Sequence, residues 1–314
     1  MKKALCIGID QYPNAPLHCC VNDARSINEL LSFNQDKTPN FAVKCLLNEQ
    51  ATQKNIITGI RELFANQADV ALLYFAGHGS MYHSGNYIIA VDYEKGNEGM
   101  SMSDILNIIN SSPVTNKIII FDCCFSGDVG TMHNCGSEAS SICPGTTILT
   151  ASRSDETSKE INGHGVFTNL LCAALEGGAA DLLGRVTPGS LYSYVDQALG
   201  PWEQRPVFKT NVSQFITIRK VTPPIAIESL HKLTVYFKRS KDIYPLDPSY
   251  EPTETNVCQK EHTNIFAELQ KLVKVGLVVP VQEEHMYYAA IHSTGCRLTP
   301  LGQHYWYLVK DRRI

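Results

Sequence analysis

Six short apolar runs constrain the fold of this chain more than any other feature. They are rich in Ile, Val, Leu and Phe, and each has the length of a strand buried on both faces. Amphipathic segments typical of helices separate several of them. The alternation of strand and helix predicts an α/β fold with a doubly wound, mostly parallel sheet and helices on both faces. The runs are Ala4 to Ile9, Ala42 to Leu47, Val70 to Phe75, Tyr87 to Val91, Lys117 to Phe121 and Thr146 to Thr150.

Helix start signals lie between these runs. Thr52 is a good N-cap for a helix that reaches Phe64, and Ser101 or Ser103 caps a helix that ends near Asn110. A last strand from Phe215 to Ile218 is expected to complete the sheet. The remaining predicted helices span Asn22 to Leu31, Phe167 to Leu175 and Pro188 to Leu199.

The character of the sequence changes after Val221-Thr-Pro-Pro224. A chain of 314 residues exceeds what one core usually organises, so we expect two domains, residues 1–220 and residues 221–314. Helix, strand, strand and helix follow in an order that predicts a winged-helix domain. The elements expected there are a helix-like Ile225 to Phe237, a helix from Glu261 to Val275, strands Leu277 to Val281 and Met286 to Ile291, and a helix opened by Thr299-Pro300.

Composition excludes several classes of function. The net charge of -4 gives no electrostatic reason to expect nucleic acid as the main partner. No window approaches the roughly 18 apolar residues of a membrane-spanning helix. The 11 cysteines are an odd number without paired CxxC spacing, so neither a disulfide framework nor a zinc site is implied. We expect a protein of the reducing cytoplasm without cofactor or metal.

Two strands run directly into residues that carry chemistry. The first ends in Ala76-Gly-His78-Gly79, and the second ends in Asp122-Cys123-Cys124 followed by Phe-Ser-Gly127. Because ligands bind beyond the carboxyl ends of parallel strands, both groups are expected at one edge of the sheet. An imidazole beside a thiol activates it as a nucleophile, and the backbone amides of Gly79 and Cys124 are candidates for an oxyanion hole.

Each of these residues has an ordinary structural interpretation. A His at a strand end is more often structural, and a cysteine in an apolar run is more often a small core residue. A Gly-His-Gly after one buried strand and an Asp-x-Cys-x-Ser-Gly after another, in this order, favour catalysis.

The chain resembles the caspase-like clan of cysteine endopeptidases, which includes caspases, paracaspases and metacaspases, over about residues 1–220. The resemblance rests on Tyr74 to Gly79 and Asp122 to Gly127, supported by Cys20-Val-Asn-Asp-Ala24 and by Leu149 to Glu156. It implies a catalytic dyad of His78 and Cys124. In the family pattern the nucleophile is the cysteine two positions after the aspartate, so Cys123 is expected to be buried.

The resemblance also implies a preference for substrates. Metacaspases and paracaspases bind Arg or Lys before the cleaved bond in an acidic pocket, and the matching residues are Asp23 and Asp122, with Glu156 or Asp155 as a third carboxylate. Asp23 can alternatively cap the first helix, and Asp122 can bond a loop amide. One departure is Ala76, where metacaspases commonly carry a serine. The segment Gly178 to Gly184 holds a single carboxylate, so it is a poor calcium site.

The second domain leaves alternatives open. The helix His262 to Lys274 carries only two basic residues, which argues for a protein-docking role over DNA binding. Caspase-like peptidases with such appended domains resemble bacterial effectors of regulated proteolysis, including defence systems. The rival functions are a silent caspase-like sensor or scaffold and a DNA-binding regulator. The basic stretch Lys238 to Lys241 is a candidate cleavage site in a linker between the domains.

Overall fold

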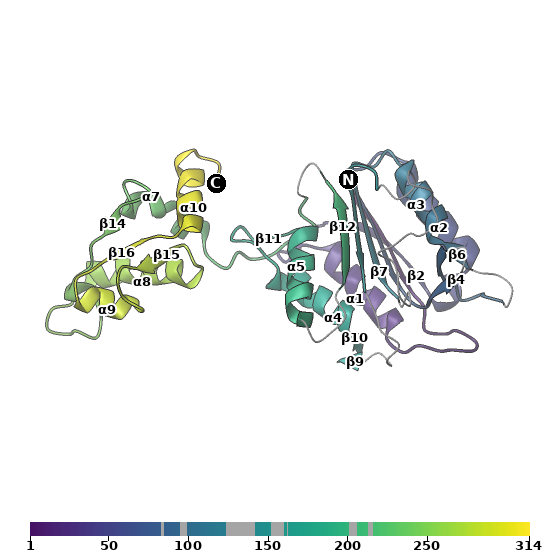
Figure 1. Ribbon diagram of the computed structural model, residues 1–314, viewed down its shortest axis with the longest axis horizontal. Helices are drawn as coiled ribbons and strands as arrows, with labels where there is room; N and C mark the ends of the chain where they lie inside the picture. Colours follow the sequence, from purple (N-terminus) through teal and green to yellow (C-terminus); the bar gives the residue numbers. More distant parts are fainter. Residues whose placement is uncertain are drawn as a thin grey trace. The chain divides into compact units, whose positions relative to one another are not determined.

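The computed structural model describes residues 1–82, 85–94, 99–123, 142–151, 160–161, 163–200, 206–212 and 216–314 (Figure 1). The chain forms two compact units. Unit 1 contains Met1–Ala180 and Gly184–Thr222, and unit 2 contains Asp181–Leu183 and Pro223–Ile314. No helix among the described residues is both long and apolar enough to cross a membrane.

Unit 1 is built on a six-stranded sheet with the strand order β12-β8-β7-β3-β1-β2. The pairs β1–β2, β1–β3, β3–β7 and β7–β8 are parallel, and only the edge strand β12 pairs antiparallel, with β8. The expected mostly parallel sheet is therefore confirmed. Its strands are β1 (Lys2–Gly8), β2 (Ala42–Leu47), β3 (Val70–Ala76), β7 (Asn116–Asp122), β8 (Thr146–Thr150) and β12 (Val207–Asn211).

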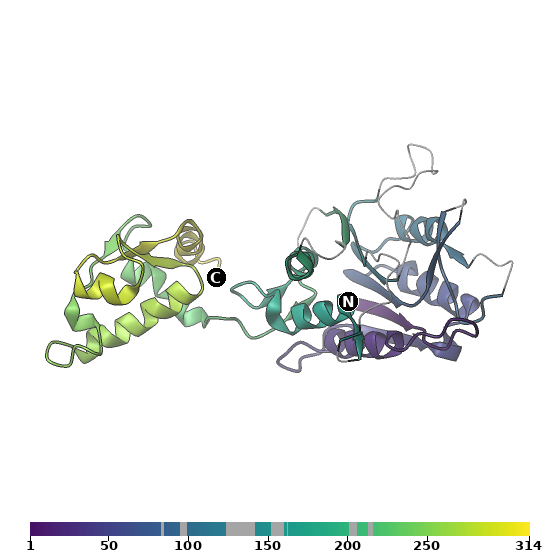
Figure 2. The same cartoon turned by 60° about the horizontal axis from the view of Figure 1, so that its bottom comes forward.

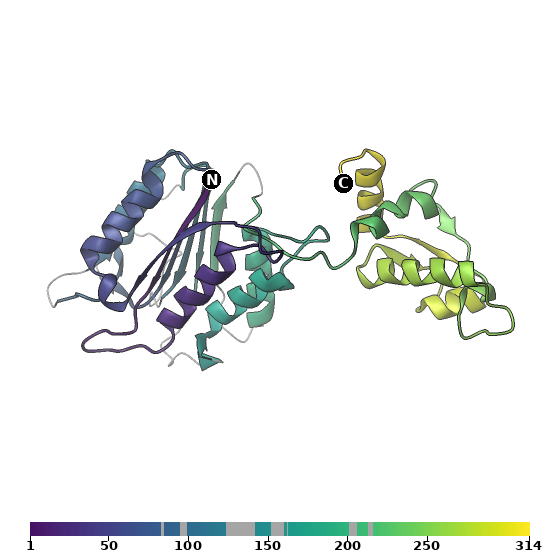
Figure 3. The same cartoon turned by 180° about the vertical axis from the view of Figure 1, so that it is seen from behind.

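Helices cover both faces of this sheet, as Figures 1 and 3 show from opposite sides. One face packs against α1 (Cys20–Ser32), α4 (Val166–Ala173) and α5 (Pro188–Leu199). The other packs against α2 (Gln53–Ala65) and α3 (Met102–Asn110). Thr52 and Ser101 cap α2 and α3 through their side chains, as their positions in the sequence predict.

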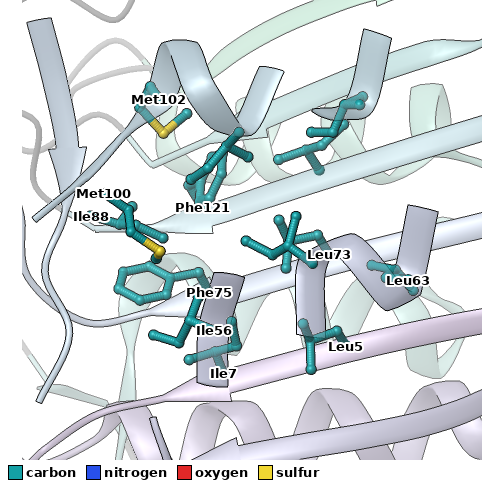
Figure 4. Packing of buried hydrophobic residues seen from close by; sticks show 14 of the residues in the cluster. Leu5, Ile7, Ile56, Leu63, Leu73, Phe75, Ile88, Met100, Met102 and Phe121 are labelled. Carbon is teal, nitrogen blue, oxygen red and sulfur yellow. The ribbon is translucent and has the colours of Figure 1, made fainter. Parts of the chain in front are cut away.

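Two hydrophobic cores result from the alternation of side chains along the strands. In β3, Leu73 and Phe75 point to the α2/α3 face, whereas Leu72 and Tyr74 point to the α1/α4/α5 face. Figure 4 shows part of the α2/α3 core, where Phe75 and Phe121 pack beside Met100 and Met102. The β3 and β7 strands are almost entirely buried, so they are the rigid frame for whatever follows their ends.

Two expected sheet strands are corrected by the structure. The run Tyr87 to Val91 does not join the central sheet, because β5 (Gly85–Ile88) pairs with β4 (Gly79–Tyr82) and β6 (Met100–Ser101) in a separate antiparallel sheet. The run Phe215 to Ile218 is not the last strand. Its residues 216–218 are not in a strand, and β12 completes the sheet instead.

Short elements complete unit 1. They connect the main layers or extend helices at their ends. They are the 3-10 turn Asn48–Gln50, the paired strands β9 (Glu160–Ile161) and β10 (His164–Gly165), the π-helical turn Ala174–Gly178, and the paired strands β11 (Arg185–Val186) and β13 (Arg219–Lys220).

Unit 2 surrounds a three-stranded antiparallel sheet in the order β14-β16-β15 with helices (Figure 2). Thr299 accepts a hydrogen bond from the Gly302 amide and caps the last helix, as predicted. The elements are α6 (Ile227–His231), α7 (Leu233–Tyr236), β14 (Ile243–Tyr244), a 3-10 turn (Pro248–Tyr250), α8 (Lys260–Lys274), β15 (Val278–Pro280), α9 (Met286–Ile291), β16 (Cys296–Leu298) and α10 (Pro300–Lys310).

Three expectations for this region were wrong. Met286 to Ile291 is a helix, not a strand, because Met286, Ala289 and Ala290 fall on one buried face at helical spacing. The expected helix from Ile225 to Phe237 is two short helices. The basic stretch Lys238 to Lys241 lies between α7 and β14 inside unit 2, so it is not a linker between domains.

We expect Gly8→Ala to destabilise unit 1 by about 1–3 kcal/mol, because the added Cβ would overlap the Cys20 carbonyl oxygen and approach the Ala24 Cβ to 2.8 Å. Urea denaturation followed by circular dichroism measures the change. Gly59→Ala is the matched control, because its Cβ would meet only the flexible ends of the Leu5 and Leu46 side chains, at 3.1 and 3.5 Å. Alanine also gains roughly 0.5–1 kcal/mol in helix propensity over glycine. Equal destabilisation by both changes would show that the close approach of α1 to Gly8 does not limit stability.

Candidate active site

The site begins with the register of two neighbouring strands. In the parallel pair of β3 and β7, Ala76 lies opposite Asp122, and the Gly77 amide donates a hydrogen bond of 3.3 Å to the Asp122 carbonyl. His78 is two residues beyond Ala76, and Cys124 is two residues beyond Asp122. The register therefore ends the two strands at the same edge of the sheet.

The backbone of His78 is held on both sides. Its amide donates to the Tyr12 hydroxyl at 3.0 Å, and this hydroxyl donates in turn to the Ile89 carbonyl at 3.0 Å. The His78 carbonyl accepts a hydrogen bond of 3.0 Å from the Ile89 amide. Tyr12 thus bridges two strands at the point where a direct backbone bond is missing, and burial raises the pKa of its hydroxyl so that it stays a donor.

The ring of His78 is oriented by two further contacts. It packs on the Tyr12 ring with a centroid distance of 4.5 Å, and its Nε2 lies 2.7 Å from the carbonyl oxygen of Ala15. A carbonyl only accepts hydrogen bonds, so Nε2 carries the proton. In the neutral ring, Nδ1 is then the basic nitrogen.

The glycines on either side of His78 have separate reasons. A Cβ on Gly77 would lie 2.5 Å from the Tyr12 hydroxyl, so only glycine fits beneath this bridge. Gly79 pairs with Ile88 in the antiparallel ladder, and the preceding pair, His78 and Ile89, is hydrogen-bonded. Hydrogen-bonded and non-hydrogen-bonded pairs alternate in such a ladder. The Gly79 amide therefore points away from β5.

The two adjacent cysteines differ in what the structure describes. Cys123 is fully buried in the α2/α3 core, as expected for the cysteine that is not the nucleophile. Cys124 and Glu156 lie outside the described residues, as does Asp155. Their predicted roles stay predictions.

Asp122 is buried on the opposite face of the sheet, at 2% exposure. Its Oδ2 accepts a hydrogen bond of 2.6 Å from the Thr168 hydroxyl, and Tyr74 lies 2.6 Å from the same hydroxyl. Because Thr168 gives its proton to Asp122, Tyr74 donates to Thr168. Asp122 thus bonds a side chain of α4, and this bond is not the loop amide contact considered from the sequence alone.

Asp23, from α1, is also 2% exposed and meets the start of α4. Its Oδ1 lies 2.6 Å from Nδ1 of His164, and its Oδ2 accepts a bond of 3.3 Å from the Gly165 amide. The capping role is taken by another carboxylate, since Asp10 accepts the amides of Cys20 and Val21 at 2.8 and 3.3 Å. Asp23 is therefore not needed to cap the helix.

The two carboxylates shape the electrostatics of this corner. Burial raises the pKa of Asp23 to about 6, and the negative charge of Asp122 adds to the increase, while the hydrogen bond from His164 opposes it. Burial likewise raises the pKa of Tyr74, next to Asp122, and keeps it a donor. The corner favours an added positive charge.

Four residues of this arrangement were not predicted from the sequence. Tyr12 and Ala15 hold His78, and His164 and Thr168 hold the carboxylates. Ala15 acts through its backbone carbonyl, for which a sequence carries no signal. Thr168 stands in the first turn of the helix predicted from Phe167, and His164 lies three residues before that helix. This position is the one signal in the sequence that could have indicated them.

The comparisons with known proteins agree with this fold. The caspase domain family matches residues 1–220, so the chain belongs to that family of cysteine peptidases. A crystal structure of a Geobacter sulfurreducens protein has a TM-score of 0.50 and 18% identity, covering 70% of this chain and 99% of that one. Caspase-1 from Spodoptera frugiperda has a TM-score of 0.50 and 13% identity, covering 70% and 90%. No curated protein sequence matches significantly.

We expect Asp23→Asn to gain stability relative to wild type as the pH rises from about 4 to 7. A carboxyl group whose pKa is raised to about 6 in the folded state binds its proton more tightly there than in the unfolded chain. Losing that proton therefore costs wild-type stability across this window, by about 1–3 kcal/mol, and the Asn variant avoids the cost. Urea denaturation at several pH values measures the difference.

Asp36→Asn is the matched control, because hydrogen bonds from Thr38 lower the pKa of Asp36. This carboxylate stabilises the folded state above its unfolded pKa, and the contribution is lost as the pH falls. The control should thus lose stability relative to wild type with rising pH. A trend of the same sign in both variants would contradict the assignment for Asp23.

Proposed function

We propose that this protein is a cysteine endopeptidase that cleaves peptide bonds after Arg or Lys, with Cys124 as nucleophile and His78 as its base. Membership of the caspase domain family supports a cysteine peptidase in general. The observation that supports the proposal for this chain is the register of Ala76 opposite Asp122, because the strands that precede His78 and Cys124 in the sequence end at one edge of the sheet.

In the proposed reaction, Nδ1 of His78 takes the proton of the Cys124 thiol, and the thiolate attacks the scissile carbonyl carbon. The amides of Gly79 and Cys124 stabilise the negative oxygen that forms. The protonated imidazole then gives its proton to the leaving amine, and a thioester remains on Cys124. A water molecule, deprotonated by the same imidazole, hydrolyses the thioester and restores the thiol.

The bond from Nε2 of His78 to the Ala15 carbonyl supports this role. It holds the ring in the tautomer that leaves Nδ1 basic, and it stabilises the imidazolium that forms during the reaction. Tyr12 supports the position of the ring through the His78 amide. The alternation of pairs in the β4–β5 ladder points the Gly79 amide away from β5.

The basic preference is proposed from Asp23 and Asp122, with Glu156 as a third carboxylate. Two carboxylates buried at one corner suit the guanidinium of arginine or the ammonium of lysine, because either cation forms charge-assisted hydrogen bonds with carboxylates. Ala76 supplies no hydroxyl there, so the carboxylates would carry the recognition. Burial of both groups favours the charged ligand over water.

For unit 2 we propose a winged-helix type of docking module that binds a protein partner. The sheet order β14-β16-β15 and the preceding helices support it. Lys271 of α8 and Lys232 both bind Glu268, at 2.5 and 3.2 Å, so part of the positive charge that DNA binding would use is already neutralised. A regulated effector protease of the reducing cytoplasm fits this combination better than a DNA-binding regulator or a silent scaffold.

We expect Cys124→Ala and His78→Ala each to lower kcat/KM on an arginine-terminated fluorogenic peptide at least about a thousand-fold, because each removes a partner of the dyad. Cys123→Ala is the matched control. Its thiol lies in the α2/α3 core, so we expect less than a roughly tenfold change in kcat/KM with a small loss of stability. Loss of activity in Cys123→Ala and retention in Cys124→Ala would contradict the choice of nucleophile.

We expect Asp122→Asn to raise KM for arginine and lysine peptides roughly tenfold or more, because it removes one carboxylate charge while the Thr168 hydrogen bond retains an acceptor. A peptide with citrulline, the uncharged isostere of arginine, serves as the control substrate and should respond little. Matched peptides ending in aspartate should not be cleaved. Cleavage after aspartate by wild type would refute the acidic pocket.

A further inference from the structure

His164 is the most exposed member of the carboxylate corner. Its side chain is 18% exposed, whereas that of its partner Asp23 is 2% exposed. Asn22 Nδ2 lies 3.3 Å from Nε2 of the ring and donates to the Gly163 carbonyl at 2.8 Å, so the imidazole is supported from α1 as well. A ligand that reaches Oδ1 of Asp23 must therefore displace or bypass this ring.

We propose that His164 is a specificity-determining residue that occupies Asp23 in the free enzyme and is displaced when a basic substrate side chain binds. The inference rests on the proposed function and deepens it, because it assigns the residue that competes with Arg or Lys for this carboxylate. His164 thus takes the place at Asp23 that the guanidinium or ammonium of the substrate would take.

The contacts of Asp23 make this competition necessary. Its Oδ1 is used by Nδ1 of His164 at 2.6 Å, a short bond, while Oδ2 receives only the longer 3.3 Å bond from Gly165. A guanidinium pairs with a carboxylate through two parallel hydrogen bonds and needs both oxygens. Arginine can reach that geometry only when the imidazole leaves Oδ1.

The structure also provides room for the displaced ring. His164 lines a cavity of about 620 Å³ between α1 and α4, whose walls include Asn169 and Cys172. The imidazole can turn toward this space without entering either hydrophobic core. The same space accepts a longer side chain at position 164.

The charges around the pair favour a cation over an empty site. Asp122 from β7 and Tyr74 from β3 face Asp23, and Cys172 of α4 interacts with it as well. Glu29 of α1 and Glu176, in the π-helical turn after α4, line the cavity together with Lys37 and Arg219. Arg219 is committed to the carbonyls of Phe33 and Leu175, at 3.0 and 2.7 Å. His164 is therefore the side-chain donor that occupies Asp23 among the described residues.

The test compares His164→Ala and His164→Lys with wild type on arginine and citrulline peptides. His164→Ala removes the group that competes for Asp23, so KM for arginine should fall about fivefold. His164→Lys places a permanent ammonium there, which competes more strongly, so KM for arginine should rise at least about tenfold. We expect kcat for arginine and both constants for citrulline to change less than about threefold. His164→Leu, which keeps a side chain of similar size but donates no hydrogen bond, replaces the Ala variant if that one folds poorly, and its KM for arginine should also lie below that of wild type.

Opposite shifts of KM in the two variants are the expected result. A merely structural role would weaken arginine binding in both, and equal shifts or no shift would overturn the inference. The same peptides are titrated calorimetrically into the Cys124→Ala protein, which reads binding without turnover. Absence of cleavage in wild type together with opposite shifts in these binding constants would refute the peptidase and leave the inference standing. Absence of any arginine binding would overturn the inference.

Discussion

The in-register pairing of β3 and β7 is the constraint on which the site depends. It sets Ala76 opposite Asp122, so that β3 and β7 end at the same level of the sheet edge. Side chains alternate along β7, so Asp122 faces α1 and α4 while Cys123 faces α2 and α3. A shift of one residue would exchange these two, placing a carboxylate in an apolar core and a thiol in the acidic corner.

The acidic corner has an energetic cost that the fold offsets locally. Two carboxylates at 2% exposure repel each other and lose most of their hydration. The first residues of α4 and the strand before it supply compensating donors, namely His164, the Gly165 amide and Thr168. Because α1, β7 and α4 come from distant parts of the chain, the corner forms only when all three have docked, which links the proposed binding site to complete folding of unit 1.

Much of the frame could be predicted from the sequence. The bounds of β2, β8 and α5 agree with their apolar runs and caps, because buried strands and capped helices leave strong local patterns. The segment Met286 to Ile291 was misread, because six apolar residues suit a strand or a helix and only the burial of Ala289 and Ala290 decides. The Ala15 carbonyl and the His164–Asp23 contact could not be predicted, since both depend on loop paths and packing that no local pattern encodes.

The two halves of the proposed site are built from opposite faces of one sheet. His78 is positioned by Tyr12, which belongs to the α2/α3 core, whereas Asp23 and Asp122 are positioned from the α1/α4 face. The packed sheet between them transmits little local rearrangement, because interiors at crystal-like density resist small shifts. Changes around Tyr12 should therefore act mainly on the chemical step, and changes at the start of α4 mainly on substrate binding.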